Sequence, residues 1–245
     1  MLADFIHSNR LRNKITSTLL LDVKGAYDHV SKNRLLTILK DLALPDSVIK
    51  WVSSFISGRS LKLLFNRQSD ENQPIQTGIP QGSPISPILF LIYIRGLFRS
   101  RAVKFISYVD DITLSFASTS PRKNAKILGL VAKELFQLAS KNAIQFDLKK
   151  SELIHFTTSK RAKLASLILP DGTIVPLKQT VKWLGIHFDA LLRFKEHITI
   201  RTAKAKSTFG RISRLANSEQ GLSPTTFRQL YLACITSMSD YASLI

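Results

Sequence analysis

The sequence predicts an α+β domain over about residues 15–180, followed by a helical and basic part beyond about residue 190. Strand-like and helix-like segments alternate irregularly along the chain, and no fixed-period repeat or low-complexity tract is visible, which excludes solenoids and linker arrays. The chain has 245 residues, of which 44% are hydrophobic, so it can form one large domain or two small ones.

The first half of the domain predicts one strand, two helices and two further strand segments. The apolar run 16–23 is rich in strand-forming residues, and helices are expected over 31–44, with Ser31 as N-cap, and over 45–58. Strands should follow at 60–66 and 73–77. Helical spacing assigns to the core Leu35, Leu36, Leu39 and Leu42 of the first helix, and Val48, Val52, Phe55 and Ile56 of the second.

The second half begins with a Gly/Pro-rich loop over 78–86 that leads into an apolar helix from Ser86. A long amphipathic helix is expected over 122–142, and the chain beyond about 190 should be mainly helical. Sheet segments are expected at four further places, namely 103–117 as a tight hairpin, 144–156 as strand, turn and strand, 170–177 and 181–188.

The charge of the chain favours a polyanionic partner. Lys and Arg total 35 against 17 Asp and Glu, which gives a formal net charge of +18, and nucleic acid is the natural candidate. Cys234 is the only cysteine, which excludes internal disulfides and Cys-based zinc sites, and the five histidines lack zinc-ligand spacing. The longest apolar run, 84–94, is too short to span a bilayer, so we expect a soluble intracellular protein without a membrane partner.

Two adjacent carboxylates, Asp110 and Asp111, stand out in this basic chain because apolar, strand-forming residues flank them on both sides. Asp is common in turns, so a solvated hairpin turn is one interpretation. Partly buried carboxylates instead need a compensating cation, and Mg²⁺ is held by one or two carboxylates plus substrate phosphates. Asp22, at the end of an apolar run, could add a carboxylate from a neighbouring strand. Together they predict a two-metal centre for nucleotidyl transfer, as in a polymerase.

Five motifs in order carry a resemblance to a known family. They are LLLDVKGAYDHV from Leu19, GIPQGSPISPILF from Gly78, YVDD from Tyr108, LKKSELIHF from Leu148 and VKWLGIHFD from Val181. The chain resembles the reverse transcriptase domain of non-LTR retrotransposons, which is built on the right-hand palm of nucleic-acid polymerases. The resemblance implies an α+β palm over 16–190, with an antiparallel sheet backed by helices, residual fingers at 1–15 and the start of a helical thumb at 191–245.

The resemblance also implies roles at the carboxylate centre. Asp22 and Asp110 would bind two Mg²⁺ ions, for which Mn²⁺ could substitute, and Val23 would offer its carbonyl as a ligand. Asp111 would be the neighbour that tunes the field or supports the metal site. Lys150 matches a lysine that could protonate the leaving pyrophosphate. Lys149 beside it makes this match ambiguous, and a solvated charge fits equally well.

Further residues would contact the incoming nucleotide. Tyr27 lies where family members place an aromatic ring beneath the sugar, and a ring there would collide with a 2′-hydroxyl and so select deoxynucleotides. Gln81 would lie against the nucleotide and the template base, Gly82 would let the backbone approach closely, and Ser83 would open the following helix. A core tyrosine and a purely structural loop are the alternatives. Asp28 is expected to be a local cap or a salt-bridge partner.

Primer and duplex contacts are expected toward the C-terminal part. Trp183, Leu184 and Gly185 would form the primer grip, although Trp183 fits a core position equally well. Basic residues at the start of the thumb could follow a duplex backbone at helical spacing, with a solvated helix face as the alternative for each. These residues are Arg201, Lys204, Lys206, Arg211 and Arg214.

The expected function is that of an RNA-directed DNA polymerase that uses an RNA template, a DNA or RNA primer and dNTPs. The first palm motif begins close to Met1, and no endonuclease domain, RNase H domain or Cys/His knuckle is recognised, so we expect a truncated piece of a longer element protein. A binding relic that cannot hold a triphosphate is the alternative, whereas Tyr27 disfavours RNA synthesis. The resemblance implies nuclear action, although no clear targeting signal is visible.

Overall fold

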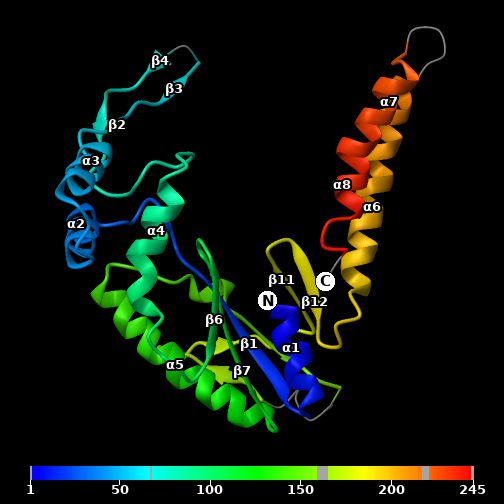
Figure 1. The fold of residues 1–245 in the computed structure, drawn as a ribbon, viewed down its shortest axis with the longest axis horizontal. Coiled ribbons are helices and arrows are strands. Elements are labelled where there is room, and N and C mark those ends of the chain that lie inside the picture. The colour runs from blue at the N-terminus through cyan, green and yellow to red at the C-terminus, as the bar shows by residue number, and fades with distance from the viewer. Residues whose placement is uncertain (1, 67, 159–164, 217–220, 244–245) are drawn as a thin grey trace.

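The centre of the molecule is a four-stranded antiparallel sheet (Figure 1). This computed structural model describes residues 2–66, 68–158, 165–216 and 221–243. The strands lie in the order β6 (Lys104–Tyr108), β7 (Asp111–Ser118), β1 (Ile15–Asp22) and β8 (Glu152–Phe156). The strands expected within 16–23 and 103–117 are therefore confirmed, and they are neighbours in one sheet.

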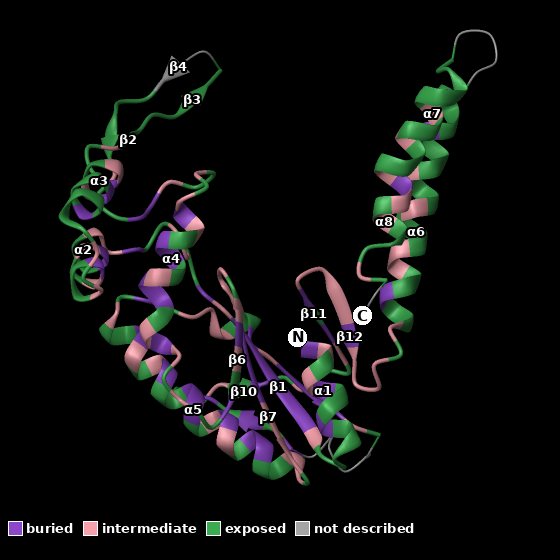
Figure 2. Cartoon of the chain, viewed as in Figure 1, coloured by how far each residue is buried: buried purple, intermediate pink, exposed green. Residues whose placement is uncertain are grey.

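Strand β1 is buried on both faces, which explains its unbroken apolar run. Side chains alternate between the two faces of a strand, so Leu19 and Leu21 point into one core and Leu20 points into another. β8 divides in the same way, with Leu153 in the first core and Ile154 in the second. In Figure 2 the buried positions accordingly concentrate on the sheet and the elements that cover it.

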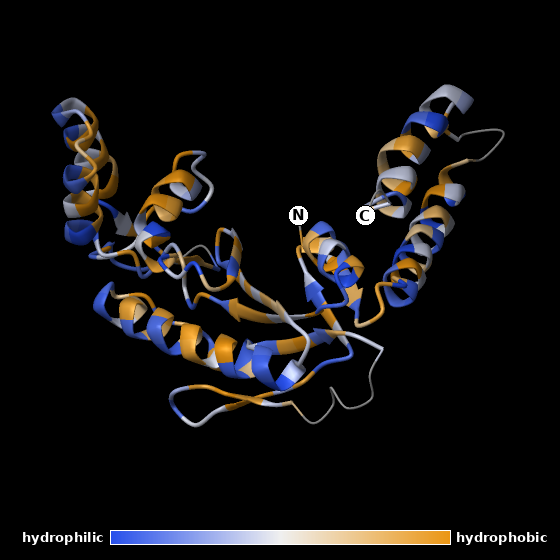
Figure 3. Cartoon of the chain, turned by 60° about the horizontal axis from the view of Figure 1, so that its bottom comes forward, coloured by the Kyte–Doolittle hydropathy of each residue, from blue (hydrophilic) through white to orange (hydrophobic). Residues whose placement is uncertain are grey.

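Helices α4 (Ser86–Ile94) and α5 (Pro121–Lys141) belong to the layer over the first face. α5 buries a stripe that includes Leu128, Val131 and Leu135, and the alternation of apolar and polar residues along this helix is visible in Figure 3. Pro121 starts the helix at a position where its missing N–H costs no hydrogen bond. The amphipathic helix expected over 122–142 is therefore confirmed.

Asn124 on α5 joins the helix to the sheet through a buried polar network. Its amide donates to the carbonyl of Ile15 at 2.7 Å and to the hydroxyl of Ser17 at 2.8 Å, and its oxygen accepts from the hydroxyl of Ser118. Ser17 also pairs with His155 of β8 at 2.7 Å. Because Asn124, Ser17 and His155 are buried, these bonds satisfy polar atoms that would otherwise be costly to leave unpaired.

The second face of the sheet is covered by α1 (Leu2–Leu11) and by the hairpin of β11 (Thr180–Trp183) and β12 (Ile186–Asp189). Leu2 and Ile6 of α1 share this core with Trp183 and Phe188 of the hairpin. α1 lies outside every element expected from the sequence. It packs against β1, and not beside the helices α2 and α3 described next.

Two arms stand on opposite sides of the sheet, and the β6–β7 turn points toward the space between them (Figure 1). The first arm contains α2 (Lys32–Asp41), α3 (Asp46–Ile56), β2 (Ser60–Leu61), β3 (Leu64–Phe65), β4 (Gln68–Ser69) and β5 (Gln73–Pro74). The second arm contains α6 (Lys195–Ile212), η4 (Ser213–Leu215), α7 (Pro224–Leu230), the π-helix η5 (Tyr231–Thr236) and α8 (Ser237–Ser239), and most of it is exposed, as Figure 2 shows. The remaining short elements are η1 (Arg95–Leu97), η2 (Leu148–Lys150), β9 (Leu167–Ile168) and β10 (Ile174–Val175).

Four local expectations are corrected by the structure. Val48 is exposed, and Ile49 takes its place in the core because α3 packs on α2 through the neighbouring helical stripe. Residues 144–147 form no strand beyond a single bridge, since Phe146 pairs only with the residue after β1. Ser31 stands at the N-cap of α2 without a side-chain hydrogen bond. Leu42 follows the last residue of α2 and is only half-buried.

The described helices include none whose length and apolar character would allow it to cross a membrane.

Replacing Asn124 with Ala should destabilise the fold by about 2–3 kcal/mol, because the carbonyl of Ile15 and the hydroxyl of Ser118 would lose a buried partner. Urea unfolding followed by circular dichroism measures this loss. Asn33→Ala on the exposed surface of α2 is the matched control and should change the free energy of unfolding by less than about 0.5 kcal/mol. Equal effects of the two substitutions would contradict the role of the buried network.

Candidate active site

The carboxylate centre is built by the register of the sheet. Asp22, the last residue of β1, lies directly opposite Asp111, the first residue of β7. The β6–β7 hairpin turns in two residues, Val109 and Asp110. The amide of Val23 donates to the carbonyl of Asp110 at 3.1 Å and ties this turn to the end of β1. The three aspartates expected to converge are therefore brought to one end of one sheet.

Val109 holds a left-handed backbone conformation, with φ at 55°. This region costs a β-branched residue on the order of 1–3 kcal/mol, yet a two-residue hairpin that follows the twist of its strands requires a positive φ. Val109 packs against the first core, which holds the turn in place. The strained conformation of Val109 therefore fixes the position of Asp110, the next residue in the turn.

Lys150 is the lysine that reaches the carboxylates. Its ammonium lies 2.8 Å from Oδ2 of Asp22 and 3.9 Å from Oδ2 of Asp147. Asp147 aligns this short helical turn, because its amide donates to the carbonyl of Asp22 at 2.9 Å and its carboxylate accepts from the amide of Lys149. Lys149 and Lys150 are both exposed, but among the described contacts only Lys150 makes an ion pair with these carboxylates. Asp147 escaped the sequence analysis, since nothing in its neighbourhood distinguishes it from an ordinary turn aspartate.

The charges at this centre influence one another. Burial raises the pKa of the Asp111 carboxyl, the charges of Asp110 and Asp22 raise it further, and Lys150 partly offsets the rise. The hydrogen bond and the charge of Asp22 raise the pKa of the Lys150 ammonium, with smaller contributions from Asp147 and Asp110. The ammonium therefore stays protonated at neutral pH and compensates part of the negative charge.

The donor set suits a hard divalent cation. Carboxylates from two adjacent strands and from the intervening turn are available, and oxygen ligands of this kind are those that Mg²⁺ prefers. Burial is the main cause of the raised pKa of Asp111, and the charges of Asp110 and Asp22 raise it further despite Lys150, so a cation beside these carboxylates would be favoured electrostatically. Across the described ranges no three His, Cys, Asp or Glu side chains form a ready-made metal cluster. Mg²⁺ sites commonly use only one or two carboxylates, which this arrangement offers.

Tyr27 lies between the carboxylates and α4. Its ring centroid is 5.6 Å from that of the buried Phe90 on α4. Burial raises the pKa of the Tyr27 hydroxyl, and the charges of Asp110 and of Tyr108 raise it further. The side chain is half-buried, so it backs onto the core and still borders the carboxylate centre.

The loop that precedes α4 is fastened to the loop that follows β1. The side-chain hydroxyl of Thr77 donates one hydrogen bond between the two loops, and two backbone amides donate the others. The three hydrogen bonds run from Gly78 N to Val30 O at 2.8 Å, from Ile79 N to Tyr27 O at 2.9 Å and from Thr77 Oγ1 to Asp28 O at 2.9 Å. These bonds bring the first and second palm motifs into direct contact.

Gly78 must be glycine for two reasons. Its φ is 81°, and a Cβ atom there would lie 2.8 Å from the carbonyl oxygen of Asp28 and 2.9 Å from that of Tyr27. Arg59, in the link between α3 and β2, also donates to the Gly78 carbonyl and to that of Thr77. Sequence reasoning placed Gly78 at the start of the loop without recognising this close approach.

Gln81 is held by Asp28. Its amide nitrogen donates to Oδ1 of Asp28 at 3.0 Å, so Asp28 accepts a side-chain hydrogen bond from Gln81, and neither of the two roles expected for Asp28 is found among the described contacts. Gly82 has a φ of 85°, but a Cβ atom there would meet no other described residue within 4 Å, so its glycine is required by the turn and not by close packing within the chain. Ser83 does not open α4, which begins at Ser86.

The fifth motif is divided between core and surface. Trp183 is 7% exposed and packs in the second core, where its ring centroid is 6.4 Å from that of Phe188. Leu184 and Gly185 form the two-residue turn of the β11–β12 hairpin and are half-buried. Of the expected primer grip, only this turn is therefore available to a ligand, and the Trp183 ring occupies the core position that was its alternative.

The basic residues of α6 and the turn after it also fall into two groups. Arg201 is half-buried and donates to the carbonyl of Gly185 at 3.1 Å. The other four side chains are exposed, as a duplex-binding surface requires, namely Lys204, Lys206, Arg211 and Arg214.

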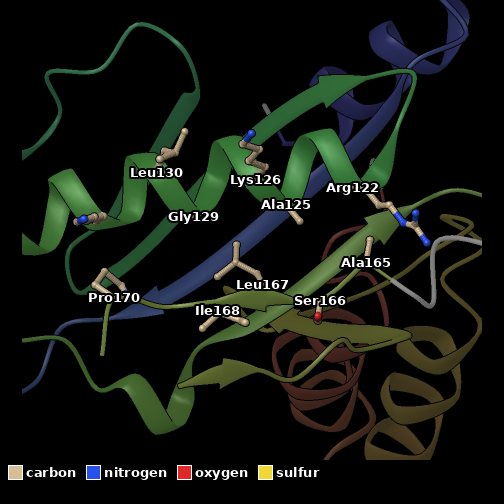
Figure 4. Close-up of a pocket in the computed structure, with 11 residues that line it drawn as sticks. Arg122, Ala125, Lys126, Gly129, Leu130, Ala165, Ser166, Leu167, Ile168 and Pro170 are labelled. Carbon is tan, nitrogen blue, oxygen red and sulfur yellow. The ribbon is translucent and has the colours of Figure 1, made fainter. Parts of the chain in front are cut away.

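A cavity of about 540 Å³ lies elsewhere, between α5 and the β9 segment (Figure 4). Arg122, Lys126 and Lys133 contribute from the helix, and Ile168 and Pro170 contribute from the other wall. None of its lining residues belongs to the carboxylate centre. The candidate active site is thus the open end of the sheet and not this hollow.

Comparison with known proteins agrees with the geometry of the sheet. The model of a family described as reverse transcriptase (RNA-dependent DNA polymerase) matches residues 2–188, which is most of the chain. The chain belongs to the reverse transcriptase family. Its membership accounts for the three convergent aspartates and for the five motifs in order.

Relatives of this chain include RNA-directed DNA polymerases of non-LTR retrotransposons, the kind of element that the motifs predicted. It is 25% identical over 192 residues to the probable RNA-directed DNA polymerase from transposon X-element of Drosophila melanogaster, covering 76% of this chain and 21% of that protein. It is 23% identical over 239 residues to the RNA-directed DNA polymerase from mobile element jockey of Drosophila funebris, covering 94% of this chain and 26% of that protein. The chain thus spans about a quarter or less of the length of these relatives.

Solved structures confirm the fold class of this chain. The telomerase of Candida tropicalis in complex with a fragment of telomeric RNA superposes with a TM-score of 0.53 at 14% identity, over 99% of this chain and 42% of that one. Apo telomerase from the same organism gives 0.53 at 13% identity, over 99% and 46%. The expected α+β palm, an antiparallel sheet backed by helices, is therefore confirmed.

Replacing Asp111 with Asn should raise the melting temperature of the chain in EDTA near pH 7. The folded-state pKa of Asp111 lies above its ordinary value of 3.8, so ionisation weakens the fold as pH rises from the unfolded toward the folded pKa. Asn cannot ionise, and the expected gain is less than about 1 kcal/mol because the side chain is partly open to solvent.

Differential scanning fluorimetry between about pH 4 and about pH 7.5 measures this gain, which should vanish at the acid end where both forms are neutral. Glu134→Gln on the exposed face of α5 removes one negative charge away from the carboxylate centre and is the matched control. A melting temperature that falls in Asp111→Asn, or rises equally in the control, would show that the carboxylates do not repel one another.

Proposed function

We propose that this chain is an RNA-directed DNA polymerase of retrotransposon origin that adds dNTPs to the 3′-hydroxyl of a primer. The observation that carries the proposal is the pairing of Asp22 with Asp111, with Asp110 in the adjoining turn and Lys150 on Asp22. An excess of carboxylates beside a protonated lysine, on a palm sheet, supports phosphoryl chemistry. Family membership supports the same reaction class.

Asp22, Asp110 and the carbonyl of Val23 would hold the divalent cations of the family, with Asp111 as the adjoining carboxylate. When bound, two Mg²⁺ or Mn²⁺ ions would favour ionisation of the primer hydroxyl and neutralise charge on the phosphates. The protein's own contribution is to keep these oxygens at one place through strand register and the Val109 turn. Pre-positioned charge of this kind costs no reorganisation during the reaction.

Lys150 would donate a proton to the departing pyrophosphate. Its pKa is raised by Asp22, so it carries the proton at neutral pH, and its ammonium already lies at the carboxylate centre. Lys149 lacks that placement, which supports Lys150 over its neighbour.

Tyr27 and Gln81 would form the nucleotide pocket. The Tyr27 ring is backed by Phe90, so it cannot recede from a bulky sugar substituent, and this supports selection of deoxynucleotides. Gln81, held by Asp28, and the flexible Gly82 would lie along the base and its template partner. The charge of Asp110 helps to raise the pKa of the Tyr27 hydroxyl, which supports a place for this ring near the reacting phosphate.

An RNA template and a DNA or RNA primer are the proposed nucleic-acid partners. The net charge of +18 and the four exposed basic side chains of the second arm support binding to a phosphate backbone. The telomerase that shares this fold was solved with a fragment of telomeric RNA, and the same class of ligand is proposed here.

Incorporation of dNTPs on a poly(rA)/oligo(dT) primer-template with Mg²⁺ tests the function. Asp110→Asn should lower incorporation at least about 100-fold, because one carboxylate at the phosphate-transfer centre is lost, and EDTA should abolish it. Asp171→Asn in the turn between β9 and β10 removes an aspartate remote from the centre and should retain wild-type incorporation. Salt-sensitive primer-template binding without incorporation, by a folded wild-type chain, would favour the binding relic instead.

Lys150 and Lys149 provide a matched pair of neighbours. Lys150→Ala should lower the rate of nucleotide addition by about 100-fold, in the range that loss of a general acid produces, whereas Lys149→Ala should stay within about twofold of the wild type. Pre-steady-state single-nucleotide addition measures this rate, and circular dichroism verifies folding. Equal losses in the two variants would indicate that both lysines act only through their charge on the nucleic-acid phosphates, and would reject Lys150 as the proton donor.

A further inference from the structure

The turn of the β11–β12 hairpin is held by the second arm. Oη of Tyr241 donates to the carbonyl of Leu184 at 2.7 Å, and the guanidinium of Arg201 donates to the carbonyl of Gly185 at 3.1 Å. The same guanidinium stacks on the ring of Tyr241, with 4.1 Å from Cζ to the ring centroid. Both carbonyls of the turn are therefore bound by a single stacked pair of side chains.

His197 completes this contact from the buried side of α6. Its Nε2 lies 3.1 Å from the carbonyl of Tyr241, and its Nδ1 lies 3.4 Å from the amide of His187 on β12. A carbonyl needs a donor and an amide needs an acceptor, so this pattern requires the neutral ring with its proton on Nε2. His197 is 5% exposed, which places this bridge between hairpin and helix in the protein interior.

The conformation of the turn suits this contact. Leu184 and Gly185 both have positive φ, at 48° and 77°. A Cβ atom on Gly185 would lie 3.4 Å from Cε1 and from Oη of Tyr241 and 3.5 Å from the guanidinium of Arg201, so the turn lies flat against the stacked pair. The body of the hairpin is fixed separately, through Val181 and Phe188 in the second core.

We propose that Arg201, His197 and Tyr241, here called the latch, are positioning residues that hold the Leu184–Gly185 turn against α6, so that the turn and the second arm act on a bound primer strand as one unit. The inference rests on the proposed polymerase function, which places the primer at this turn. It reassigns Arg201 from a phosphate contact to a structural contact, because its guanidinium already serves the Gly185 carbonyl and the Tyr241 ring.

The latch predicts an effect on how long the enzyme stays on its primer. If the turn and the arm grip together, loosening either one shortens each binding event without changing the carboxylate centre. Processivity reports this directly, because the length of product made in a single encounter does not depend on the fraction of folded enzyme.

Tyr241→Phe keeps the ring and removes one hydrogen bond, and Arg201→Lys keeps the charge and removes the planar stack. In single-encounter primer extension with a heparin trap, each should reduce the mean product length about fivefold, the effect of one lost hydrogen bond. The matched controls are Tyr231→Phe, on η5 in the same arm, and Arg193→Lys, in the link before α6, and both should extend primers as the wild type does.

Hydrogen exchange on the unliganded chain provides a readout that needs no activity. Both latch variants should raise exchange about fivefold in peptides covering 180–189 and leave peptides of β1 and β7 unchanged. Unchanged exchange at 180–189 would overturn the latch. Faster exchange with wild-type processivity would overturn its role in primer handling.

A wild-type chain that extends no primer would defeat the proposed function alone, since the exchange measurement still decides whether the latch holds the turn. Loss of extension in Arg201→Lys together with normal exchange would restore Arg201 to a phosphate-contact role and reject the inference.

Discussion

The antiparallel pairing of β1 with β7 is the constraint on which the rest of the molecule depends, because it places Asp22 opposite Asp111. A slip by one residue would separate the carboxylates and would also turn Leu19 and Leu21 toward the wrong core. The register is specified by burial on both faces and by the hydroxyl pair of Thr18 and Ser115 at 2.8 Å in the interior. The placement of Asp22 opposite Asp111 thus follows from how the core packs, and the hydrogen bonds of Val23 and Asp147 add local support.

That geometry carries a free-energy cost which the fold accepts. Three aspartates meet at one edge, burial and mutual repulsion raise the pKa of Asp111, and Val109 holds a conformation unfavourable to its side chain. Lys150 offsets part of the repulsion, and the large buried core offsets the rest. Concentration of like charge and backbone strain at one place is the usual mark of a site selected for chemistry and not for stability.

Polar contacts, rather than apolar burial, position the parts that surround the sheet. Asp147 aligns the turn of Lys150, Gly78 and Asp28 join the loops of the first two palm motifs, and Tyr241 holds the turn of the hairpin. Loops at a surface bury little apolar area, so backbone carbonyls and amides supply their fixed points. Each such contact joins two segments that would otherwise move independently around the substrate.

The sequence by itself determined the elements and the chemistry that depend on local pattern. Apolar periodicity located β1, β7, α4 and α5, and the carboxylates with their flanking motifs indicated the family and its reaction, because residue spacing along a strand or helix sets which side chains share a face. Tertiary structure alone decided which neighbours meet. It placed the Lys150 ammonium on Asp22, put Ile49 in the core in place of Val48 and gave Trp183 a core position. It also joined Tyr241 to Leu184 across 57 residues of chain, a contact that arises only when separate elements pack and that no local pattern encodes.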